Sequence, residues 1–280
     1  MIQADETPLL VNKDGRPAGS KSYMWVYRTG KYQTDRQVIL YDYQKTRKAD
    51  HPREFLKDFR GVCVTDEYQV YHTLEGELED LEVSGCWAHS RRRYDEAVKA
   101  LPKSEQKMSL AYLALSQIQQ IYHEEAKLQD MSPVERRKHR QKFIKPLVDA
   151  YFNWIRINID KVMPKSKTYN GMTYSINQEK YLRRFLDDGE IPIYNNAAEQ
   201  SIRSFCIGKK NWVMCDTING AKSSAIIYSL VETAKANKLR LYEYFNYLLT
   251  EIPEHMDDKN NDFCEKLLPW SAELPAECRK

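Results

Sequence analysis

The order of extended and helical segments in the first hundred residues constrains the fold of this chain most strongly. Extended runs, two of them aromatic and β-branched, occupy residues 1–10, 22–28 and 37–43. Asp14-Gly15 and Thr29-Gly30 supply turns between them. A short helix at 51–59, with Pro52 in its first turn, precedes two more strands at 61–65 and 82–87. The chain therefore opens with a three-stranded meander, a helix and two strands.

That order is the order of a ribonuclease-H-like core. We expect an α/β (α+β) fold in which a ribonuclease-H-like mixed sheet is flanked by helices. The middle of the chain instead shows helical spacing of apolar residues, at 91–101, 105–129, 133–162 and 174–186. A capping box at 132–135 starts the third of these helices, and Pro146 predicts a kink in it.

These patterns divide the chain into four parts. They are the first part of the core (1–102), an all-helical insertion (103–190), the second part of the core (191–250) and an acidic C-terminal tail (251–280). In the second part of the core, Asn195 or Asn196 is expected to cap a helix that carries Glu199. Residues 222–238 form a further helix, and the tail is expected to be partly extended.

Charge is distributed unevenly, although the net charge is only +3. Residues 133–167 contain ten Lys or Arg and three acidic residues, and residues 201–240 contain seven and two. Residues 241–280 contain four and nine. Two basic regions and an acidic tail fit a surface that faces a polyanion, with solvated helix faces as the alternative interpretation.

Cysteine usage and hydropathy favour a cytoplasmic protein. The six cysteines include no C-x-x-C pair, and a chain of this size does not need disulfides, so we expect reduced thiols. No apolar run follows a basic start, as it would in a signal peptide. No stretch approaches the ~18 uninterrupted apolar residues of a membrane span.

Three acidic residues stand where structure alone explains them poorly. Asp5 lies within the first strand, Asp66 ends the fourth, and Glu199 lies in the first turns of a helix among small residues. Taken singly, each has an ordinary alternative: a turn residue, a strand-end cap and a partner of the helix dipole. Their value is joint, because the first and fourth strands of a ribonuclease-H-like core lie side by side.

Clustered carboxylates repel one another and need cations to remain ionised together. Oxygen ligands favour Mg²⁺ or Mn²⁺. Two such ions, about 3.5–4 Å apart, can activate a water or a 3′-hydroxyl and stabilise the leaving oxygen of a phosphodiester. The three acids therefore predict in-line phosphoryl transfer with two metal ions as cofactors.

At these residues the sequence resembles the insertion sequence 66 family of bacterial transposases. The matching stretches occur in the family's order: ADETP (4–8), FRGVCVTDEY (59–68), GCWAHSRRRY (85–94), NNAAEQSIRS (195–204), GKKNW (208–212), YSLVETAKAN (228–237) and LLPW (267–270). The resemblance implies a ribonuclease-H-like catalytic domain that cleaves and joins DNA at transposon ends. It maps a catalytic, metal-binding DDE triad onto Asp5, Asp66 and Glu199. It also implies self-association, as in DDE transposases generally, and a bacterial, nucleoid-associated location.

The sequence departs from the family pattern in two respects. The family usually has glycine after the second acid, whereas this chain has Glu67, an extra carboxylate that is either harmless or perturbs metal binding. Full-length members also carry an N-terminal region with DNA-binding and zinc-binding segments, which does not precede Asp5 here. We therefore expect a catalytic-domain fragment, or a split or decayed reading frame.

Several further residues are candidates for DNA contact. Cys86 and His89 form a C-x-x-H string for which zinc is not expected, since no second ligand pair stands at suitable spacing. His89 is expected near the active site, or else as a strand-end histidine. The remaining candidates are basic or aromatic: Arg91, Arg92 and Arg93 at a helix start, Arg136, Arg137, Lys138 and Arg140 on the basic helix of the insertion, and Arg203, Lys209, Lys210 and Trp212.

Each of these has an alternative. The arginines at 91–93 also fit a solvated helix face, Arg203 fits a surface pair with Glu199, and Trp212 fits a core position. Two functions compete with a DNA transposase: a catalytically silent DNA-binding remnant of one, and a ribonuclease-H-like nuclease acting on RNA or hybrids. The long helical insertion before Glu199 favours the transposase, by family analogy.

Overall fold

The structure, a computed structural model, describes residues 1–32 and 36–280. Its sheet has the strand order β3-β2-β1-β4-β5. These strands are β1 (Ile2–Lys13), β2 (Lys21–Thr29), β3 (Ile39–Gln44), β4 (Gly61–Val64) and β5 (Leu81–Ser84). β2 and β3 are antiparallel, whereas β4 is parallel to β1 and to β5. The expected ribonuclease-H-like mixed sheet is thereby confirmed.

β1 is longer than the sequence indicated and has two partners along its length besides β2. Ile2 and Gln3 pair with β4, whereas Val11 pairs in parallel with β6 (Cys215–Thr217), a short strand that the sequence did not reveal. Pro8 lies between the two paired stretches. Its missing N–H therefore interrupts neither the ladder with β4 nor the ladder with β6.

The chain forms two compact units, which we call the helical unit (residues 1–3 and 48–196) and the strand unit (residues 4–47 and 197–280). The division into a core and an insertion at residues 103–190 remains an interpretation of the sequence, because those residues belong to one compact unit with β4, β5 and the preceding helices.

The helical unit contains β4, β5 and a series of helices. These are α1 (Asp50–Leu56), α2 (Gln69–Glu77), α3 (Trp87–Lys99), α4 (Lys103–Gln106), α5 (Leu110–Ala126), α6 (Pro133–His139), the π-helical η1 (Arg140–Ile144), α7 (Lys145–Asn158), the 3₁₀ turn η2 (Ile159–Lys161), α8 (Lys167–Asn177), α9 (Glu179–Arg183) and the 3₁₀ turn η3 (Arg184–Leu186). Their shared core surrounds Trp87, whose ring meets Tyr151, Phe152 and Phe185.

Two expectations about these helices were wrong in detail, and one helix was not expected. The expected helix at 105–129 is two helices, because Ser109 caps α5 by accepting the Tyr112 N–H at 3.1 Å. The helix expected at 174–186 begins earlier, as α8, and is interrupted at Gln178 before α9. α2 was not predicted, since its apolar residues are too few to show a clear helical stripe.

α6, η1 and α7 form one continuous helical segment, as the capping box at Ser132 predicted. Near Pro146, where the sequence predicts a kink, the segment contains the π-helical turn η1, which ends two residues before the proline. Arg140 begins this turn and is completely buried. Its guanidinium pairs with Glu125 on α5 and donates to the carbonyl oxygens of Phe185 (2.7 Å) and Ile191 (2.9 Å).

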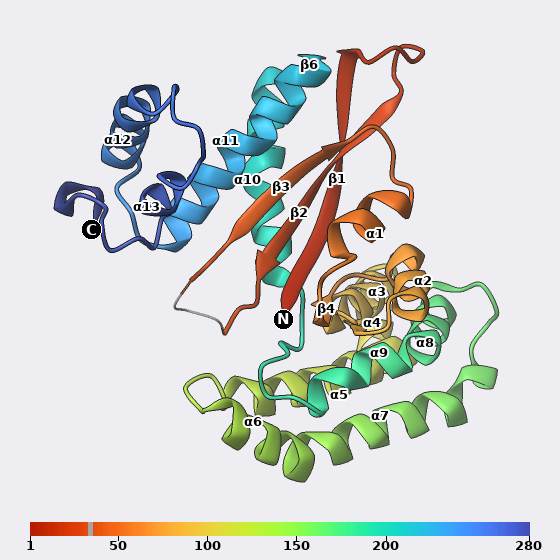
Figure 1. Ribbon diagram of the computed structural model, residues 1–280. Helices are drawn as coiled ribbons and strands as arrows, with labels where there is room; N and C mark the ends of the chain where they lie inside the picture. The colour runs from red at the N-terminus through yellow and green to blue at the C-terminus, as the bar shows by residue number, and fades with distance from the viewer. Residues whose placement is uncertain (33–35) are drawn as a thin grey trace. The chain divides into compact units, whose positions relative to one another are not determined.

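The strand unit packs helices against β1, β2 and β3 (Figure 1). The helices that pack against these strands are α10 (Asn196–Trp212) and α11 (Ile218–Ala236). They are followed in the chain by α12 (Leu241–Glu254), α13 (Cys264–Leu267) and the 3₁₀ turn η4 (Ala276–Cys278), whose apolar residues form a cluster of their own. α11 also protects the edge strand β3. Ser229 Oγ accepts the Tyr41 N–H at 2.7 Å, and Thr233 Oγ1 accepts the Ile39 N–H at 3.0 Å. Polar groups that would otherwise remain open at the sheet edge are thereby satisfied.

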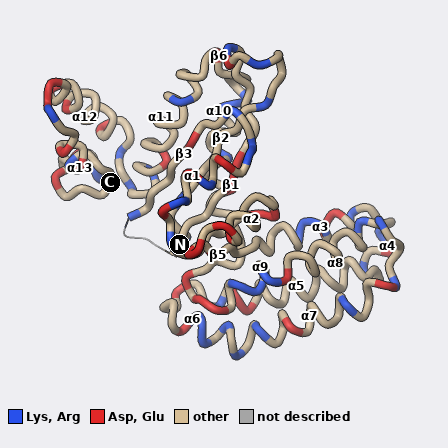
Figure 2. The backbone as a smooth tube through the Cα atoms, turned by 45° about the vertical axis from the view of Figure 1, so that its right-hand side comes forward, with Lys and Arg blue, Asp and Glu red and all other residues tan. Residues whose placement is uncertain are grey.

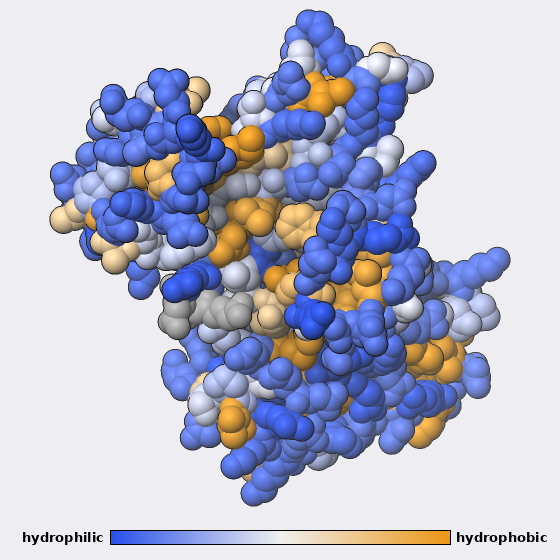
Figure 3. Space-filling view, viewed as in Figure 1, coloured by the Kyte–Doolittle hydropathy of each residue, from blue (hydrophilic) through white to orange (hydrophobic). Residues whose placement is uncertain are grey.

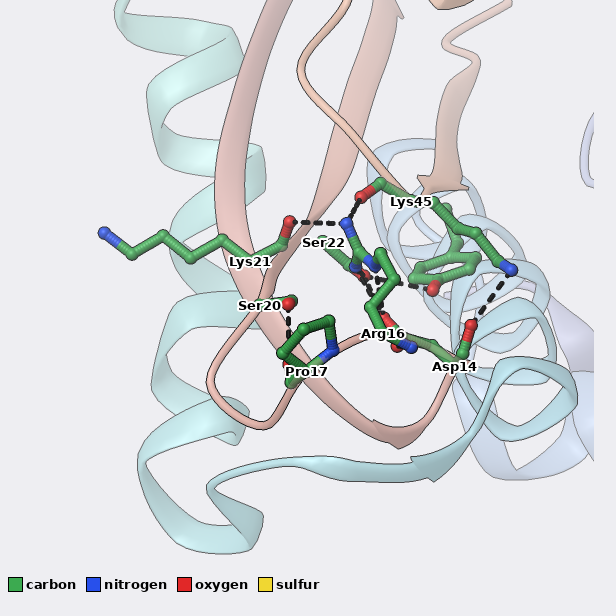
Figure 4. A network of polar contacts seen from close by, with 8 residues as sticks. Asp14, Arg16, Pro17, Ser20, Lys21, Ser22 and Lys45 are labelled. Atoms are coloured by element: carbon green, nitrogen blue, oxygen red, sulfur yellow. Dashed lines mark hydrogen bonds and ion pairs between the residues drawn. The ribbon is translucent and has the colours of Figure 1, made fainter.

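The predicted turn at Asp14-Gly15 joins β1 to β2 and is fixed by an arginine (Figure 4). Arg16 Nε donates to Asp14 Oδ2 at 2.9 Å, and its Nη2 donates to Ser22 Oγ at 2.6 Å. Lys45 Nζ donates to Asp14 O at 3.0 Å. The hydrogen bond from Arg16 holds the pKa of Asp14 below its usual value.

The C-terminal segment folds around α12 rather than trailing away. Ala234, Leu239, Tyr244, Leu248, Leu267, Leu274 and Cys278 form its own apolar cluster. Figure 2 shows the expected acidic residues along α12 and α13. In the described part of the chain, no helix is both long and apolar enough to span a membrane, and Figure 3 shows a mostly hydrophilic face.

The burial of Arg140 makes a specific stability prediction. Replacing Arg140 by Ala leaves Glu125 as an uncompensated buried charge and removes the donor from three carbonyl oxygens, those of Phe185, Asp188 and Ile191, so unfolding should become easier by about 3–5 kcal/mol. Urea denaturation followed by circular dichroism measures this. Arg137→Ala, an exposed arginine three residues earlier, should change stability by less than about 0.5 kcal/mol. Equal stability of the two variants would contradict the assignment.

Candidate active site

Asp5 lies on β1, half-buried, within the strand unit. Its Oδ1 accepts the N–H of Glu6 at 2.8 Å. Side chains alternate along a strand, so Asp5 shares a face with Thr7 and Leu9, whereas Glu6 points to the other face and pairs with Arg47. The face of Asp5 is the one that α10 covers, since Leu9 packs in the same cluster as Ala198, Ile202 and Phe205.

Glu199 lies in the first turn of α10, also half-buried. Glu199 and Cys206 are seven residues apart and therefore share a face of the helix. Cys206 Sγ donates to Thr7 Oγ1 at 3.4 Å, and Lys209 Nζ donates to Pro8 O at 2.7 Å. α10 thus lies along β1 with the face of Glu199 turned toward the strand.

The two elements run in the same direction. Thr7 meets Cys206, and further along β1 Val11 pairs with Cys215, which follows α10. Moving back from these contacts, Asp5 precedes Thr7 by about 7 Å of strand, and Glu199 precedes Cys206 by about 10 Å of helix. The strand unit therefore brings Asp5 and Glu199 to the same end of β1 and α10, on facing sides.

Asp66 belongs to the helical unit and lies two residues after Val64, the last residue of β4. Its Oδ1 accepts the Tyr68 N–H at 2.9 Å, which fixes the turn between β4 and α2. The register of the β1–β4 pair matches Gln3 with Val64. Asp5 and Asp66 each follow one of these paired residues by two positions along the chain.

A buried amide near the start of α10 escaped the sequence analysis. Gln3 is fully buried, and its Nε2 donates to Asn195 Oδ1 at 3.1 Å. Asn195, expected as a possible helix cap, is the residue before α10. Its hydrogen bond with Gln3 connects it to the beginning of β1 within the helical unit. A fully polar residue within an apolar strand was the available signal, because buried amides require partners.

Cys86 and His89 lie at the start of α3 in the helical unit. Cys86 is buried, and its Sγ accepts the Asn195 N–H at 3.1 Å. His89 lies in the first turn of α3 and is half-buried. The string therefore belongs to a helix start, rather than to the end of β5, which stops at Ser84.

The arginines that follow are placed differently from what the sequence suggested. α3 begins at Trp87, so Arg91, Arg92 and Arg93 lie in its second turn and not at its start. Arg91 and Arg92 are exposed. Arg93 forms an ion pair with Glu67 and stacks over Tyr174, with its guanidinium carbon 4.3 Å from the ring centre. The carboxylate that departs from the family pattern is thus held by a neighbouring cation.

Two of the candidates for DNA contact in the insertion lie inside the protein, which does not favour such a contact. Arg136 and Arg140 are buried, with 3% and 0% of their surface exposed. Arg136 Nη1 donates to Gly189 O at 2.6 Å, and Arg140 pairs with Glu125, so neither guanidinium faces solvent. Their neighbours Arg137 and Lys138 are exposed.

The basic candidates on α10 fall into two groups. Arg203 and Lys210 are exposed, whereas Lys209 is half-buried and its Nζ donates a hydrogen bond to the carbonyl oxygen of Pro8. The Trp212 ring packs edge-on against Phe205 with ring centres 5.4 Å apart. The alternative in which Trp212 contributes to the core is therefore the better description of its place.

Comparison with known proteins gives consistent matches over the chain. Residues 1–223 match the family described as "Transposase IS66 family", and residues 229–270 match the "IS66 C-terminal element". Among curated sequences, "Uncharacterized protein y4qI" of Sinorhizobium fredii is 27% identical over 280 residues, covering 96% of this chain and 50% of that protein. "Uncharacterized protein y4jD" of the same organism is 26% identical over 239 residues, or 84% of this chain and 45% of that protein. The chain thus spans about half the length of these relatives.

The hydrogen bond at Asp66 yields a prediction about variants. Asp66→Asn retains an oxygen that can accept the Tyr68 N–H, whereas Asp66→Ala loses it. The alanine variant should therefore be less stable than the asparagine variant by about 0.5–1.5 kcal/mol in thermal unfolding. Identical melting of the two would show that the turn does not depend on this side chain.

Proposed function

Because the chain belongs to the IS66 family of transposases, we propose that Asp5, Asp66 and Glu199 are its catalytic carboxylates, which cleave and join DNA strands at transposon ends. The observation that carries the proposal is the arrangement around β1. α10 runs along β1 in the same direction and turns the face of Glu199 toward the face of Asp5. The register of β1 with β4 supports adding Asp66, because Asp5 and Asp66 each follow, by two positions along the chain, one member of the matched pair Gln3 and Val64.

The donor set fits divalent cations. All three side chains offer carboxylate oxygens, the ligands that Mg²⁺ and Mn²⁺ prefer. Asp66 is oriented by the Tyr68 N–H on Oδ1, so Oδ2 is its oxygen for a cation. Two bound ions would supply the charge that activates a water or 3′-hydroxyl and stabilises the leaving oxygen. The protein's part is to hold the oxygens in place and to position the DNA.

DNA contact is assigned to exposed cations on three helices. Those with exposed side chains are Arg91 and Arg92 on α3, Arg137 and Lys138 on α6, and Arg203 and Lys210 on α10. Such residues bind phosphates and carry little sequence information. His89 is proposed to contact a phosphate or a carboxylate at the catalytic centre. Glu67 and a DNA phosphate are proposed to compete for the guanidinium of Arg93. The place of action would be the bacterial chromosome.

We predict metal-dependent nicking or strand transfer when the purified chain is incubated with a transposon-end duplex and Mg²⁺ or Mn²⁺. Asp5→Asn, Asp66→Asn and Glu199→Gln should each lower the rate by at least about 100-fold, since each removes a charged metal ligand. Gel electrophoresis of end-labelled DNA measures the products. Asp216→Asn is the matched control, because it removes an exposed carboxylate from the strand unit.

Two results would decide against this function. DNA binding without cleavage, by this chain and by a longer form that includes an N-terminal region, would support a silent remnant. Hydrolysis of RNA–DNA hybrids but not of duplex DNA would support a ribonuclease-H-like nuclease. Cleavage that persists in all three variants would show that other residues bind the metals.

A further inference from the structure

A polar cavity lies in the strand unit, separate from the face that carries Asp5 and Glu199. Its volume is about 560 Å³. It is lined by the end of β2, the start of β3, the first half of α10 and the C-terminal end of α11: Arg28, Lys31, Gln37, Ile39, Gln200, Ser201, Ser204, Glu232, Lys235, Ala236 and Lys238. Four of these residues are cationic and one is acidic, so the cavity carries an excess of positive charge.

Arg28 anchors this cavity. Its guanidinium donates to neutral oxygens: Ala197 O (3.2 Å), Ser201 Oγ (3.1 Å) and Gln37 Oε1 (2.7 Å). Burial lowers the pKa of Arg28, yet a guanidinium stays protonated at neutral pH. A positive charge is therefore held rigidly in a partly desolvated place, where an incoming anion would be attracted more strongly than in water.

The acidic member of the lining does not cancel this charge. Glu232 is largely buried and pairs with Lys235 at 2.8 Å, one turn further along α11. Arg28, Lys31 and Lys238 remain as the excess. Around them, Ser204, Gln200 and Gln37 supply hydroxyl and amide groups. Cations surrounded by such donors are suited to phosphate oxygens and to the sugar oxygens beside them.

The position of the cavity on α10 links it to the proposed catalytic face. Gln200 directly follows Glu199, and Ser204 follows Gln200 by one turn, so both lie on a neighbouring face of the same helix. One rigid helix therefore carries a candidate metal ligand on one side and part of the basic cavity on the next. A strand of DNA whose scissile phosphate lies near Glu199 would have another phosphate within reach of this cavity.

We propose that this cavity binds the sugar–phosphate backbone of the DNA strand. This inference rests on the proposed function and adds a binding site for the same substrate. The cavity is too large for a lone phosphate group, and its lining is too polar for an apolar ligand. Contacts to the backbone position the strand without reading its bases, so the effect should not depend on sequence.

The test compares two glutamine variants, both in the full chain. Lys31→Gln combined with Lys238→Gln removes two of the excess charges from the cavity and keeps the Glu232–Lys235 pair, whereas Lys222→Gln removes one exposed charge from α11 outside it. DNA affinity is measured by fluorescence anisotropy over a salt series of about 50 to 200 mM, on duplexes of unrelated sequence. Circular dichroism confirms that all variants are folded.

We expect the double variant to bind every duplex roughly 10-fold more weakly, with a salt dependence lower by about one to two units of slope, while Lys222→Gln binds like the parent. Unchanged affinity and slope in the double variant would overturn the inference. So would binding of inorganic phosphate that the double variant loses while its DNA affinity stays the same, because the cavity would then serve free phosphate.

Cleavage measured in parallel separates this inference from the proposed function. Weakened DNA binding in the double variant, in a chain that never cleaves DNA, would sustain the cavity and defeat the catalytic proposal. Normal DNA binding in the double variant, in a chain that cleaves DNA through its carboxylates, would do the reverse.

Discussion

The pairing of β1 with its neighbours is the interaction on which the rest of the structure depends. Its first residues pair with β4, its last residues pair with β6, and α10 lies along one of its faces. A strand fixed at both ends cannot slip by one residue without turning Asp5 to the opposite face. The backbone hydrogen bonds of β1 therefore determine which side chains α10 meets, and with them the direction in which the carboxylates point.

The arginines of this protein differ in whether they have hydrogen-bond partners inside the fold. Arg140 and Arg136 are buried and donate hydrogen bonds to carbonyl oxygens, and Arg140 also pairs with Glu125. Arg28 occupies an intermediate place, because neutral oxygens hold its guanidinium while its charge still faces a cavity. Exposed cations such as Arg91 and Arg137 face solvent, where a polyanion can bind them. Burial, rather than the number of basic residues in a segment, separates structural cations from candidates for DNA binding.

Much of the sheet could be predicted, because its strands are short apolar runs separated by turn residues. Asp14-Gly15 predicted the turn of the first hairpin, and the apolar run before Asp66 predicted β4. β6 could not be predicted, since three residues carry no periodicity and their pairing with Val11 is determined by the distant β1. The break before α5 depends on the side chain of Ser109, a signal that was present but was outweighed by helical spacing on both sides.

The candidate site was predictable only as far as local patterns reach. Asp5 stood out because a strand interior rarely carries an aspartate, whereas Asp66 and Glu199 have ordinary roles at a strand end and in a first helical turn and gained their value only jointly with it. The burial of Arg136 and Arg140 was not foreseen because they stand in a basic run, although their spacing of four continues to the buried Ile144 and Val148. The basic cavity was invisible in the sequence, because Arg28 and Lys238 lie far apart in the chain and only packing gives them a common cavity.

Anomalous diffraction from crystals of the chain grown with Mn²⁺ tests the central claim most directly. The account predicts two manganese peaks about 3.5–4 Å apart, coordinated by oxygens of Asp5, Asp66 and Glu199. Manganese bound elsewhere, or bound at Asp5 and Asp66 with Glu199 outside the coordination sphere both with and without DNA, would contradict it.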